Sequence, residues 1–179
     1  MVPMDSPITK NTTDNQDELF VVVDEQNNIV GYKTRSECHN DPSLLHRSVH
    51  VAVVNSEGKI LLQKRSMTKD LSPGWYCISV GGHVEKGEDD LTTAVRELEE
   101  ELGIKDVQPR FVTSFLSFNE PDSERVALFT VTHDGPFYCN KEEIEEVRLF
   151  DKQEIEKVKE TITKRARRSL VILHFLKSA

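Results

Sequence analysis

Glu97, Glu100 and Glu101 stand at positions i, i+3 and i+4 of the stretch GGHVEKGEDDLTTAVRELEEELGI, which covers residues 81–104. On a helix this spacing places the three side chains on one face. Like charges on one face repel one another unless a cation lies among them, and carboxylate oxygens are the ligands that Mg²⁺ and Mn²⁺ prefer. The spacing therefore admits two interpretations, a solvated acidic helix face or a site for a divalent cation.

The residues around the three glutamates favour the cation. Arg96 stands beside them and could pair with Glu88, which would tie the preceding loop to the helix. The glycines at positions 81 and 82 let the backbone come close to a metal ion or a phosphate group. The sequence thus predicts a loop and a helix that together surround a cation.

The helix that must carry the glutamates is predicted over residues 89–102. Leu91, Val95, Leu98 and Leu102 recur at steps of three or four residues, and Gly103 is well placed to end the helix. We expect these four apolar residues to anchor the helix against a sheet.

The remaining elements are mostly strands. Apolar runs bounded by turn residues predict strands at 19–24, 29–34, 49–55, 60–65, 75–82, 110–118 and 125–133, with a further strand within 142–151. Residues 36–47 are expected to be irregular or a short helix, and the tail over about 152–177 to be helical. This mixture predicts an α/β sandwich with a mixed sheet. Residues 1–18 are predicted to be a flexible N-terminus, and residues 19–179 a single domain.

Composition excludes several classes of function. The chain has 179 residues and a formal net charge of −8, which argues against broad binding to nucleic acid. No apolar run approaches the roughly 20 residues of a membrane span, and the first residues do not resemble a signal peptide. Three widely spaced cysteines without a CxxC pair suit reduced thiols. We therefore expect a cytoplasmic protein with no nucleic-acid or membrane partner, whose oligomeric state the sequence leaves open.

The segment 82–104 resembles a complete Nudix box. The pattern of that box is a glycine, five residues, a glutamate, seven residues, and then R-E-U-x-E-E-x-G-U, where U is aliphatic. Its nine fixed positions are matched here by Gly82, Glu88, Arg96, Glu97, Leu98, Glu100, Glu101, Gly103 and Ile104.

This resemblance implies a Nudix hydrolase with the α/β/α sandwich of that family. Such an enzyme would cleave a diphosphate linked to another moiety, with Mg²⁺ or Mn²⁺ as cofactor. By the resemblance Glu97, Glu100 and Glu101 bind the metal, Arg96 belongs to the catalytic box, and the Gly82 carbonyl is a further ligand. The general base stays open between Glu97, Glu100 and the acidic segment 142–146.

A wider resemblance covers roughly residues 19–150. The stretches HRSVHVAVVN, LLQKRS and SVGGHV are similar to the branch that includes isopentenyl diphosphate isomerase. In that isomerase a separate metal site uses three histidines and two acids. The matching positions imply a second divalent-metal site here, formed by His39, His46, His83, Asp122 and Glu124. The alternative for each of these histidines is an ordinary surface or hydrogen-bonded residue.

The isomerase reaction itself is disfavoured. The catalytic cysteine of the isomerase would fall at Gly81, and glycine cannot transfer a proton. The sequence therefore predicts hydrolysis on an isomerase-like frame. An isomerase and a non-catalytic nucleotide-binding module are the alternatives.

Basic residues outside the box carry weaker predictions. Lys64 or Arg65, at the end of a predicted strand, could contact the substrate phosphate, although alternation along the strand would place one of them in solvent. Lys69 in the following loop is a similar case. The run KRARR at 164–168 is interpreted as a solvated basic face of the tail helix. The substrate is expected to be a small-molecule diphosphate, with a nucleoside diphosphate or its derivative preferred from the resemblance.

Overall fold

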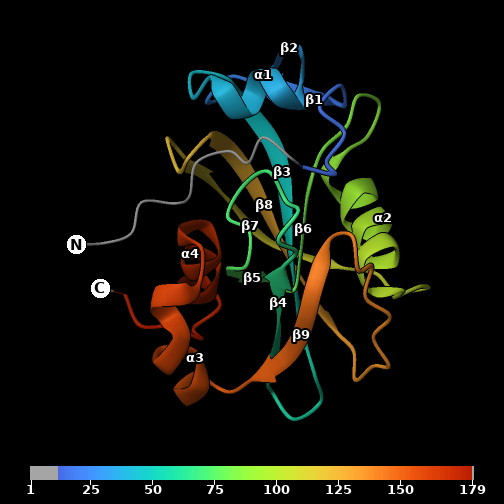
Figure 1. The fold of residues 1–179 in the computed structure, drawn as a ribbon, viewed down its shortest axis with the longest axis vertical. Coiled ribbons are helices and arrows are strands. Elements are labelled where there is room, and N and C mark those ends of the chain that lie inside the picture. Colours follow the sequence, from blue (N-terminus) through green and yellow to red (C-terminus); the bar gives the residue numbers. More distant parts are fainter. Residues whose placement is uncertain (1–11, 179) are drawn as a thin grey trace.

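The computed structural model describes residues 12–178 and consists of a mixed sheet between two helical layers (Figure 1). The nine strands are β1 (Leu19–Val23), β2 (Ile29–Thr34), β3 (Leu45–Val54), β4 (Ile60–Arg65), β5 (Tyr76–Ile78), β6 (Val80–His83), β7 (Arg110–Ser117), β8 (Ser123–Thr132) and β9 (Ile144–Phe150). The helices are α1 (Arg35–Asn40), α2 (Asp90–Leu102), α3 (Lys152–Val158), the 3₁₀ turn η1 (Lys159–Thr161) and α4 (Lys164–Ile172). The predicted α/β fold with a mixed sheet is thereby confirmed.

The sheet divides into two parts that diverge from one hairpin. Strand β3 pairs antiparallel with β1 and β6 and parallel with β8, whose other neighbour is β7. Strand β4 pairs antiparallel with β5 and β9. The register between β3 and β4 contains a single pair, Val54 with Ile60. Beyond that pair the two strands separate, and the space between them is where a site can form.

The segment 75–82 was predicted to be one strand, and this prediction is wrong. The segment breaks at Ser79, so that β5 pairs with β4 whereas β6 pairs with β3. The buried Ser79 hydroxyl donates to the carbonyl oxygen of Leu61 and accepts from the amide of Val53 at 2.8 Å. One side chain thus satisfies backbone groups of both diverging strands, which explains why the strand changes partner at this residue.

Helix α2 covers one side of the sheet, and its orientation differs from the prediction. Leu98 and Leu102 are fully buried against the strands, but Leu91 and Val95 are 49% and 40% exposed. Thr93, Ala94 and Glu101 are the additional buried positions of the helix. The helix is therefore turned so that it carries a carboxylate toward the sheet, rather than the apolar stripe inferred from the sequence.

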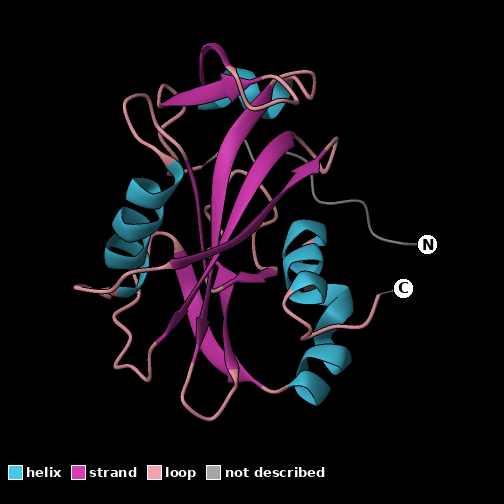
Figure 2. Cartoon of the chain, turned by 180° about the vertical axis from the view of Figure 1, so that it is seen from behind, coloured by secondary structure: helices cyan, strands magenta, loops and turns pink. Residues whose placement is uncertain are grey.

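The opposite side of the sheet is covered by α3 and α4 (Figure 2). Ile155 and Leu170 pack there against Ile60 and Leu62 of β4. The predicted continuous helix over 152–177 is wrong, because the chain is extended at residues 162 and 163 between η1 and α4. The Thr163 amide donates to the carbonyl oxygen of Tyr76 at 2.9 Å, so the interruption attaches the tail to β5.

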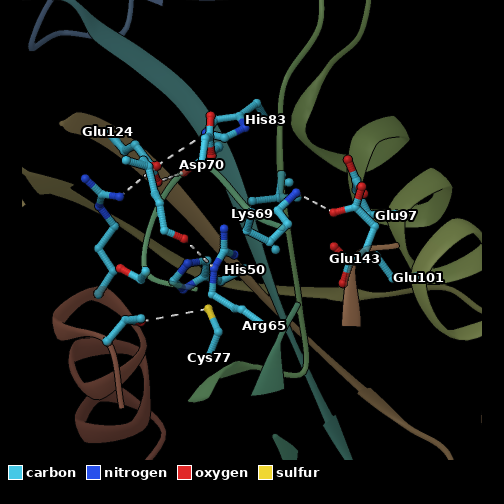
Figure 3. A pocket seen from close by; sticks show the side chains of 18 of the residues that line it. His50, Arg65, Lys69, Asp70, Cys77, His83, Glu97, Glu101, Glu124 and Glu143 are labelled. Carbon is cyan, nitrogen blue, oxygen red and sulfur yellow. Dashed lines mark hydrogen bonds and ion pairs between the residues drawn. The ribbon is translucent and has the colours of Figure 1, made fainter. Parts of the chain in front are cut away.

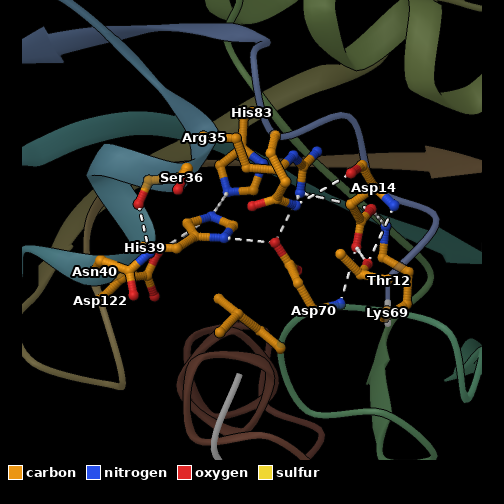
Figure 4. A network of polar contacts seen from close by, with 12 residues as sticks. Thr12, Asp14, Arg35, Ser36, His39, Asn40, Lys69, Asp70, His83 and Asp122 are labelled. Carbon is orange, nitrogen blue, oxygen red and sulfur yellow. Dashed lines mark hydrogen bonds and ion pairs between the residues drawn. The ribbon is translucent and has the colours of Figure 1, made fainter. Parts of the chain in front are cut away.

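The first described residues are attached to the domain. The expected flexible N-terminus is residues 1–18, of which residues 1–11 lie outside the described part of the chain. The Asp14 carboxylate accepts from the amide of Asp70 at 2.9 Å and from the Lys69 ammonium, and it lies 3.6 Å from Arg35 (Figure 4). Residues 36–40 belong to α1, which bears out the short helix considered for that region. None of the described helices is long and apolar enough to cross a membrane.

Candidate metal and phosphate site

A cavity of about 210 Å³ opens where β3 and β4 diverge (Figure 3). Acidic side chains of α2 form one wall, and residues from the end of β4 and the loop after it form another. The floor comes from β3 and from the glycines of β6. Elements far apart in the sequence therefore meet at one polar hollow.

The three glutamates of α2 all line this cavity, but they differ in exposure. Glu101 is buried and accepts a hydrogen bond from the Gln63 amide at 2.7 Å. Glu97 accepts from Arg96 at 2.8 Å, and its side chain is 13% exposed. Glu100 accepts from the same Arg96 at 3.0 Å, but its side chain is 56% exposed. The structure thus places two carboxylates inside the cavity and the third at its rim.

The inner carboxylates are crowded and desolvated. Burial raises the pKa of Glu97 to about 7, with the charge of Glu100 adding to the effect. Burial also raises the pKa of Glu101 well above its usual range, and the charges of Glu97 and Glu143 reinforce that shift. A raised carboxyl pKa means that the charged form is disfavoured in its surroundings. A bound divalent cation would reverse this, so the donor set fits a hard metal ion.

Glu143 is a cavity residue that the sequence did not single out. The acidic run 142–146 was expected to reach toward the site or to be a solvated turn, and of this run Glu143 lines the cavity. It is the last residue of the turn before β9 and binds the Lys69 ammonium. The run alone could not identify it, because the strand pairing of β9 with β4 decides which acid points inward.

The predicted pairing of Arg96 with Glu88 is confirmed. The Arg96 guanidinium donates to both carboxylate oxygens of Glu88, at 2.8 and 3.0 Å. Glu88 also accepts from the Thr93 hydroxyl at 2.8 Å. Bidentate pairs of this kind fix geometry as well as charge. The loop before α2 is therefore held against the helix that carries the acidic residues.

Gly82 leaves room for the Glu97 side chain. A Cβ atom at position 82 would lie 2.1 Å from Oε1 of Glu97 and 2.2 Å from its Cδ. No real contact is that short, so any larger residue would displace the carboxylate. Because position 82 has no side chain, the strand backbone and Glu97 lie close together. This closeness is expected if the Gly82 carbonyl and Glu97 bind the same metal ion.

Gly82→Ala is therefore expected to lower the affinity of the site for Mn²⁺ by roughly 10- to 100-fold, the range seen when the partners of metal ligands are lost. The melting temperature should change little, because the displaced group is the end of a flexible side chain. Calorimetric titration with Mn²⁺ would measure the effect. Gly31→Ala is the matched control, since a Cβ at that position has no atom within 4 Å. Equal affinities in the two variants would contradict a metal-binding role for this contact.

The basic residues at the end of β4 are separated by the structure. Arg65 lines the cavity, and its Nε donates to the carbonyl oxygen of Leu71 at 3.0 Å. Lys64 is not among the lining residues and pairs instead with Glu145 at 3.1 Å on the surface. Lys69 lines the cavity and binds both Asp14 and Glu143. Of these three residues, Arg65 and Lys69 are therefore the two that an anionic ligand in the cavity could meet.

A second polar group of residues adjoins the cavity. His39 of α1, His46 of β3, His83 of β6 and Asp122 just before β8 each offer a ligand atom, and these atoms all lie within 4.8 Å of one another. The Nε2 atoms of His39 and His83 are 3.4 Å apart, and Nε2 of His46 is 3.2 Å from Oδ2 of Asp122. Strand β3 pairs with both β6 and β8, which brings His46, His83 and the residue before β8 together. The four residues form the histidine cluster.

The Nδ1 atoms of His39 and His46 form hydrogen bonds with groups outside the histidine cluster. Nδ1 of His39 donates to Asp70 at 2.8 Å (Figure 4). Nδ1 of His46 donates to the carbonyl oxygen of Leu44 at 3.2 Å. Such bonds direct the Nε2 atoms inward, as in most histidine metal sites. Burial lowers the pKa of His83 to about 3, so this ring is neutral, the form that binds metal.

Two atoms at the centre of the histidine cluster form no hydrogen bond of good geometry. Within residues 12–178, Nε2 of His46 and Oδ2 of Asp122 are buried 3.2 Å apart, and although burial opposes it, the contact with Asp122 raises the pKa of His46 to about 10. A buried polar atom without a good hydrogen bond is unfavourable. A metal ion coordinated by both atoms would remove this cost. Three imidazoles with a carboxylate suit zinc or another transition metal.

Glu124 and Arg165 complete this region. Oε1 of Glu124 lies 3.4 Å from Nε2 of His83, but it also accepts from Arg165 at 2.8 Å. Arg165 donates further to Oδ1 of Asp122 at 2.6 Å. The interpretation of 164–168 as a solvated basic face is therefore wrong for Arg165, whose side chain is 11% exposed. Residue spacing could not reveal this, because the Arg165 side chain is buried only once α4 packs against the sheet.

Comparison with known proteins identifies relatives of the whole region. The NUDIX domain family matches residues 44–171. A protein of Yersinia pestis described as an uncharacterized Nudix hydrolase is 39% identical over 140 residues, which is 77% of this chain and 75% of that protein. The family match includes the acidic helix α2 and the strands β3, β4, β5 and β6 around it.

Solved structures of similar fold agree with this. DR0079 from Deinococcus radiodurans has a TM-score of 0.73 at 24% identity, covering 88% of this chain and 98% of that one. The bifunctional NMN adenylyltransferase/ADP ribose pyrophosphatase of Francisella tularensis, complexed with AMP and a manganese ion, has a TM-score of 0.58 at 18% identity. It covers 72% of this chain and 40% of the Francisella chain. At these identities the likeness concerns the fold.

Proposed function

The chain belongs to the Nudix hydrolase family, and we propose that it uses Mg²⁺ or Mn²⁺ to cleave a diphosphate linkage in a nucleoside diphosphate derivative or a similar compound. One observation carries the proposal: Glu97, Glu101 and Glu143 line the same cavity as Arg65 and Lys69, and Lys69 is paired with Glu143 where the acidic and basic residues meet. Carboxylates for a cation and cations for a phosphate are thereby brought within reach of one ligand.

The acidic wall is the proposed metal site. Glu97 and Glu101 would bind the ion from inside the cavity, Glu100 from its rim, and the Gly82 carbonyl from the strand beneath. When bound, the metal would neutralise the charge that develops on the phosphate oxygens during hydrolysis. Arg96 would act as a positioning residue, because it holds Glu97 and Glu100 while it anchors the loop through Glu88.

The basic wall is the proposed phosphate site. Arg65 presents a planar guanidinium whose remaining N–H groups suit the oxygens of a diphosphate. Lys69 supplies a compact positive charge between Glu143 and Asp14, close to where the metal and phosphate would meet. The general base is one of Glu97, Glu100 and Glu143, each of which lines the cavity. Lys64 takes no part in this scheme.

One similar structure supports the substrate class, and one alternative reaction is disfavoured by the residues present. The Francisella tularensis protein of similar fold is an ADP ribose pyrophosphatase complexed with AMP and manganese, which favours a nucleoside diphosphate derivative. The resemblance to isopentenyl diphosphate isomerase suggests the frame, but an isomerase reaction lacks its acid–base group here. Gly81 lies on β6 opposite His50, whereas the Cys77 thiol lies on β5 opposite Gln63 and is not at the required position.

The histidine cluster is proposed as a second metal site, distinct from the acidic wall. Its ligands would be His39, His46, His83 and Asp122. Glu124 could be a fifth ligand if its bond to Arg165 were given up. The pair of unsatisfied atoms on His46 and Asp122 is the support for this assignment. Since Asp70 orients His39 and also lines the main cavity, an ion at the cluster would stiffen one wall of the substrate site.

A substrate screen tests the proposed function. The protein is offered nucleoside di- and triphosphates, ADP-ribose, other nucleotide sugars, dinucleotides and isopentenyl diphosphate with Mg²⁺ or Mn²⁺, and products are identified by mass. We expect cleavage at a diphosphate bond of a nucleoside diphosphate derivative, and no cleavage in the presence of a chelator. Interconversion of isopentenyl diphosphate without release of phosphate would favour the isomerase. Binding of a nucleotide without any cleavage would favour a non-catalytic module.

A further inference from the structure

His50 is a buried imidazole on the floor of the main cavity that the proposed reaction does not use. It is 5% exposed, lies on β3 directly opposite Gly81 of β6, and lines the cavity. Figure 3 shows it beside Arg65, on the far side of Lys69 from the carboxylates of Glu97, Glu101 and Glu143. It therefore lies on the Arg65 side of Lys69, away from the glutamates that are proposed as metal ligands.

One edge of this ring is fixed and the other is open. Nδ1 of His50 forms a hydrogen bond with the Ser169 hydroxyl of α4 at 2.8 Å. Cδ2, next to Nε2, would lie 3.6 Å from a Cβ built at Gly81. Because Gly81 has no side chain, this edge of the ring faces open space above bare backbone. Over the described residues 12–178, no hydrogen-bond partner reaches Nε2.

The ring is neutral in this position. Burial lowers the pKa of His50 to about 4, although Glu124 acts in the opposite direction. Arg165 and Arg65 also disfavour its charged form. A neutral imidazole offers one donor or one acceptor at Nε2, so it cannot serve as a cation for phosphate. Because Arg65 lies beside it and can take the charged phosphate, Nε2 is left for a hydrogen-bonding group next to that phosphate.

The size of the cavity limits which part of a ligand can meet Nε2. A volume of about 210 Å³ lies below the roughly 300–1,000 Å³ of sites that enclose drug-sized ligands. It can hold a diphosphate together with the atoms next to it, whereas a base farther along the molecule would extend outside. The group that reaches His50 therefore belongs to the part of the organic moiety adjacent to the diphosphate.

We propose that Nε2 of His50 recognises a hydroxyl group on the moiety attached to the diphosphate, which makes the substrate class sugar-linked diphosphates, nucleoside diphosphate derivatives included, rather than alkyl diphosphates. This inference rests on the proposed function, since it takes the diphosphate to lie between the acidic wall and Arg65. An alkyl diphosphate would leave the buried nitrogen without a partner, and sites built to bond a hydroxyl reject analogues that lack one.

The test compares two probes that differ in hydroxyl groups, ribose 5-diphosphate and pentyl diphosphate. Their dissociation constants are measured by calorimetry with Mg²⁺ present, in wild type and in two variants. His50→Gln keeps an amide near the position of Nε2, whereas His50→Asn keeps one near Nδ1 and leaves the cavity side empty. We expect wild type to bind the ribose compound roughly 10- to 100-fold more tightly than the pentyl compound. That ratio should persist in His50→Gln and fall toward one in His50→Asn.

The test depends on binding alone, so its outcomes can be interpreted even if the protein hydrolyses neither probe. Equal affinities of wild type for the two probes would overturn the proposal, even if both variants failed to fold. An unchanged ratio in folded His50→Asn would overturn it as well, with the melting temperature showing that the variant is folded. A preference for ribose that depends on His50, without hydrolysis of either probe, would support the recognition site while the proposed hydrolase activity failed.

Discussion

Glu101→Gln is expected to lower kcat by about 10² or more for whichever diphosphate the wild-type protein hydrolyses, the scale of losing a major electrostatic stabiliser. Glu101 is buried, faces the cavity and is bonded on one side by Gln63, so its carboxylate is a fixed part of the acidic wall. The amide keeps the size of the side chain but removes the charge that would hold the cation. The measurement is steady-state kinetics at saturating Mg²⁺, together with the affinity for Mn²⁺.

The same helix supplies the control. Glu99 pairs with Lys105 in solvent and its side chain is 53% exposed, so Glu99→Gln should leave kcat close to that of wild type. Glu97→Gln should resemble Glu101→Gln, whereas Glu100→Gln, at the rim, is expected to lose turnover through a weaker metal site. If both Glu97→Gln and Glu101→Gln turned over normally, the acidic wall would not be the metal site.

Stability separates loss of chemistry from loss of fold in these variants. Burial raises the pKa of Glu101 well above its usual range, so the ionised side chain opposes folding in the absence of a cation. Replacing it by glutamine should therefore not lower the melting temperature of the metal-free protein at pH 7. A fall in kcat without a fall in melting temperature would place the effect in the site itself.

Local patterns predicted the parts of the site that lie close together in the chain. The spacing of the glutamates, the salt bridge from Arg96 to Glu88 and the end of α2 at Gly103 all depend on contacts within about two turns, which sequence periodicity captures. The rotation of α2 was missed, because Leu91 and Val95 looked like part of its buried face. Which stripe is buried depends on the strands beneath, and periodicity contains no information about them.

Sequence periodicity could not predict the parts of the site whose residues lie far apart in the chain. Asp122 reaches His46 only because β3 and β8 are parallel neighbours in register, with His46 opposite Glu124. The resemblance to a known branch supplied these residues, whereas spacing alone did not. Glu143 and Arg165 come from the last third of the chain and enter the site through β9 and α4. Their types are common on surfaces, so only the tertiary structure distinguishes them.

The second large effect is expected at the histidine cluster. Protein purified without added metal is expected to contain about one transition-metal or zinc ion per chain, and His46→Ala is expected to contain little or none. His46 contributes a buried Nε2 atom at the centre of the cluster, so its removal deletes a ligand and leaves Asp122 with Arg165 and His39 as its neighbours. Elemental analysis by mass spectrometry measures the content directly.

His133→Ala is the matched control, because His133 lies outside the cluster and bonds the Gly135 amide. Identical metal content in wild type and His46→Ala would count against the second site, as would a wild type that stays empty after incubation with Zn²⁺ or Mn²⁺. In that case Arg165 would be the cation that this buried group requires. It already binds both Asp122 and Glu124, so the cluster would then be a polar network that fastens α4 to the sheet. The metal content therefore decides whether the three histidines are ligands or part of the scaffold.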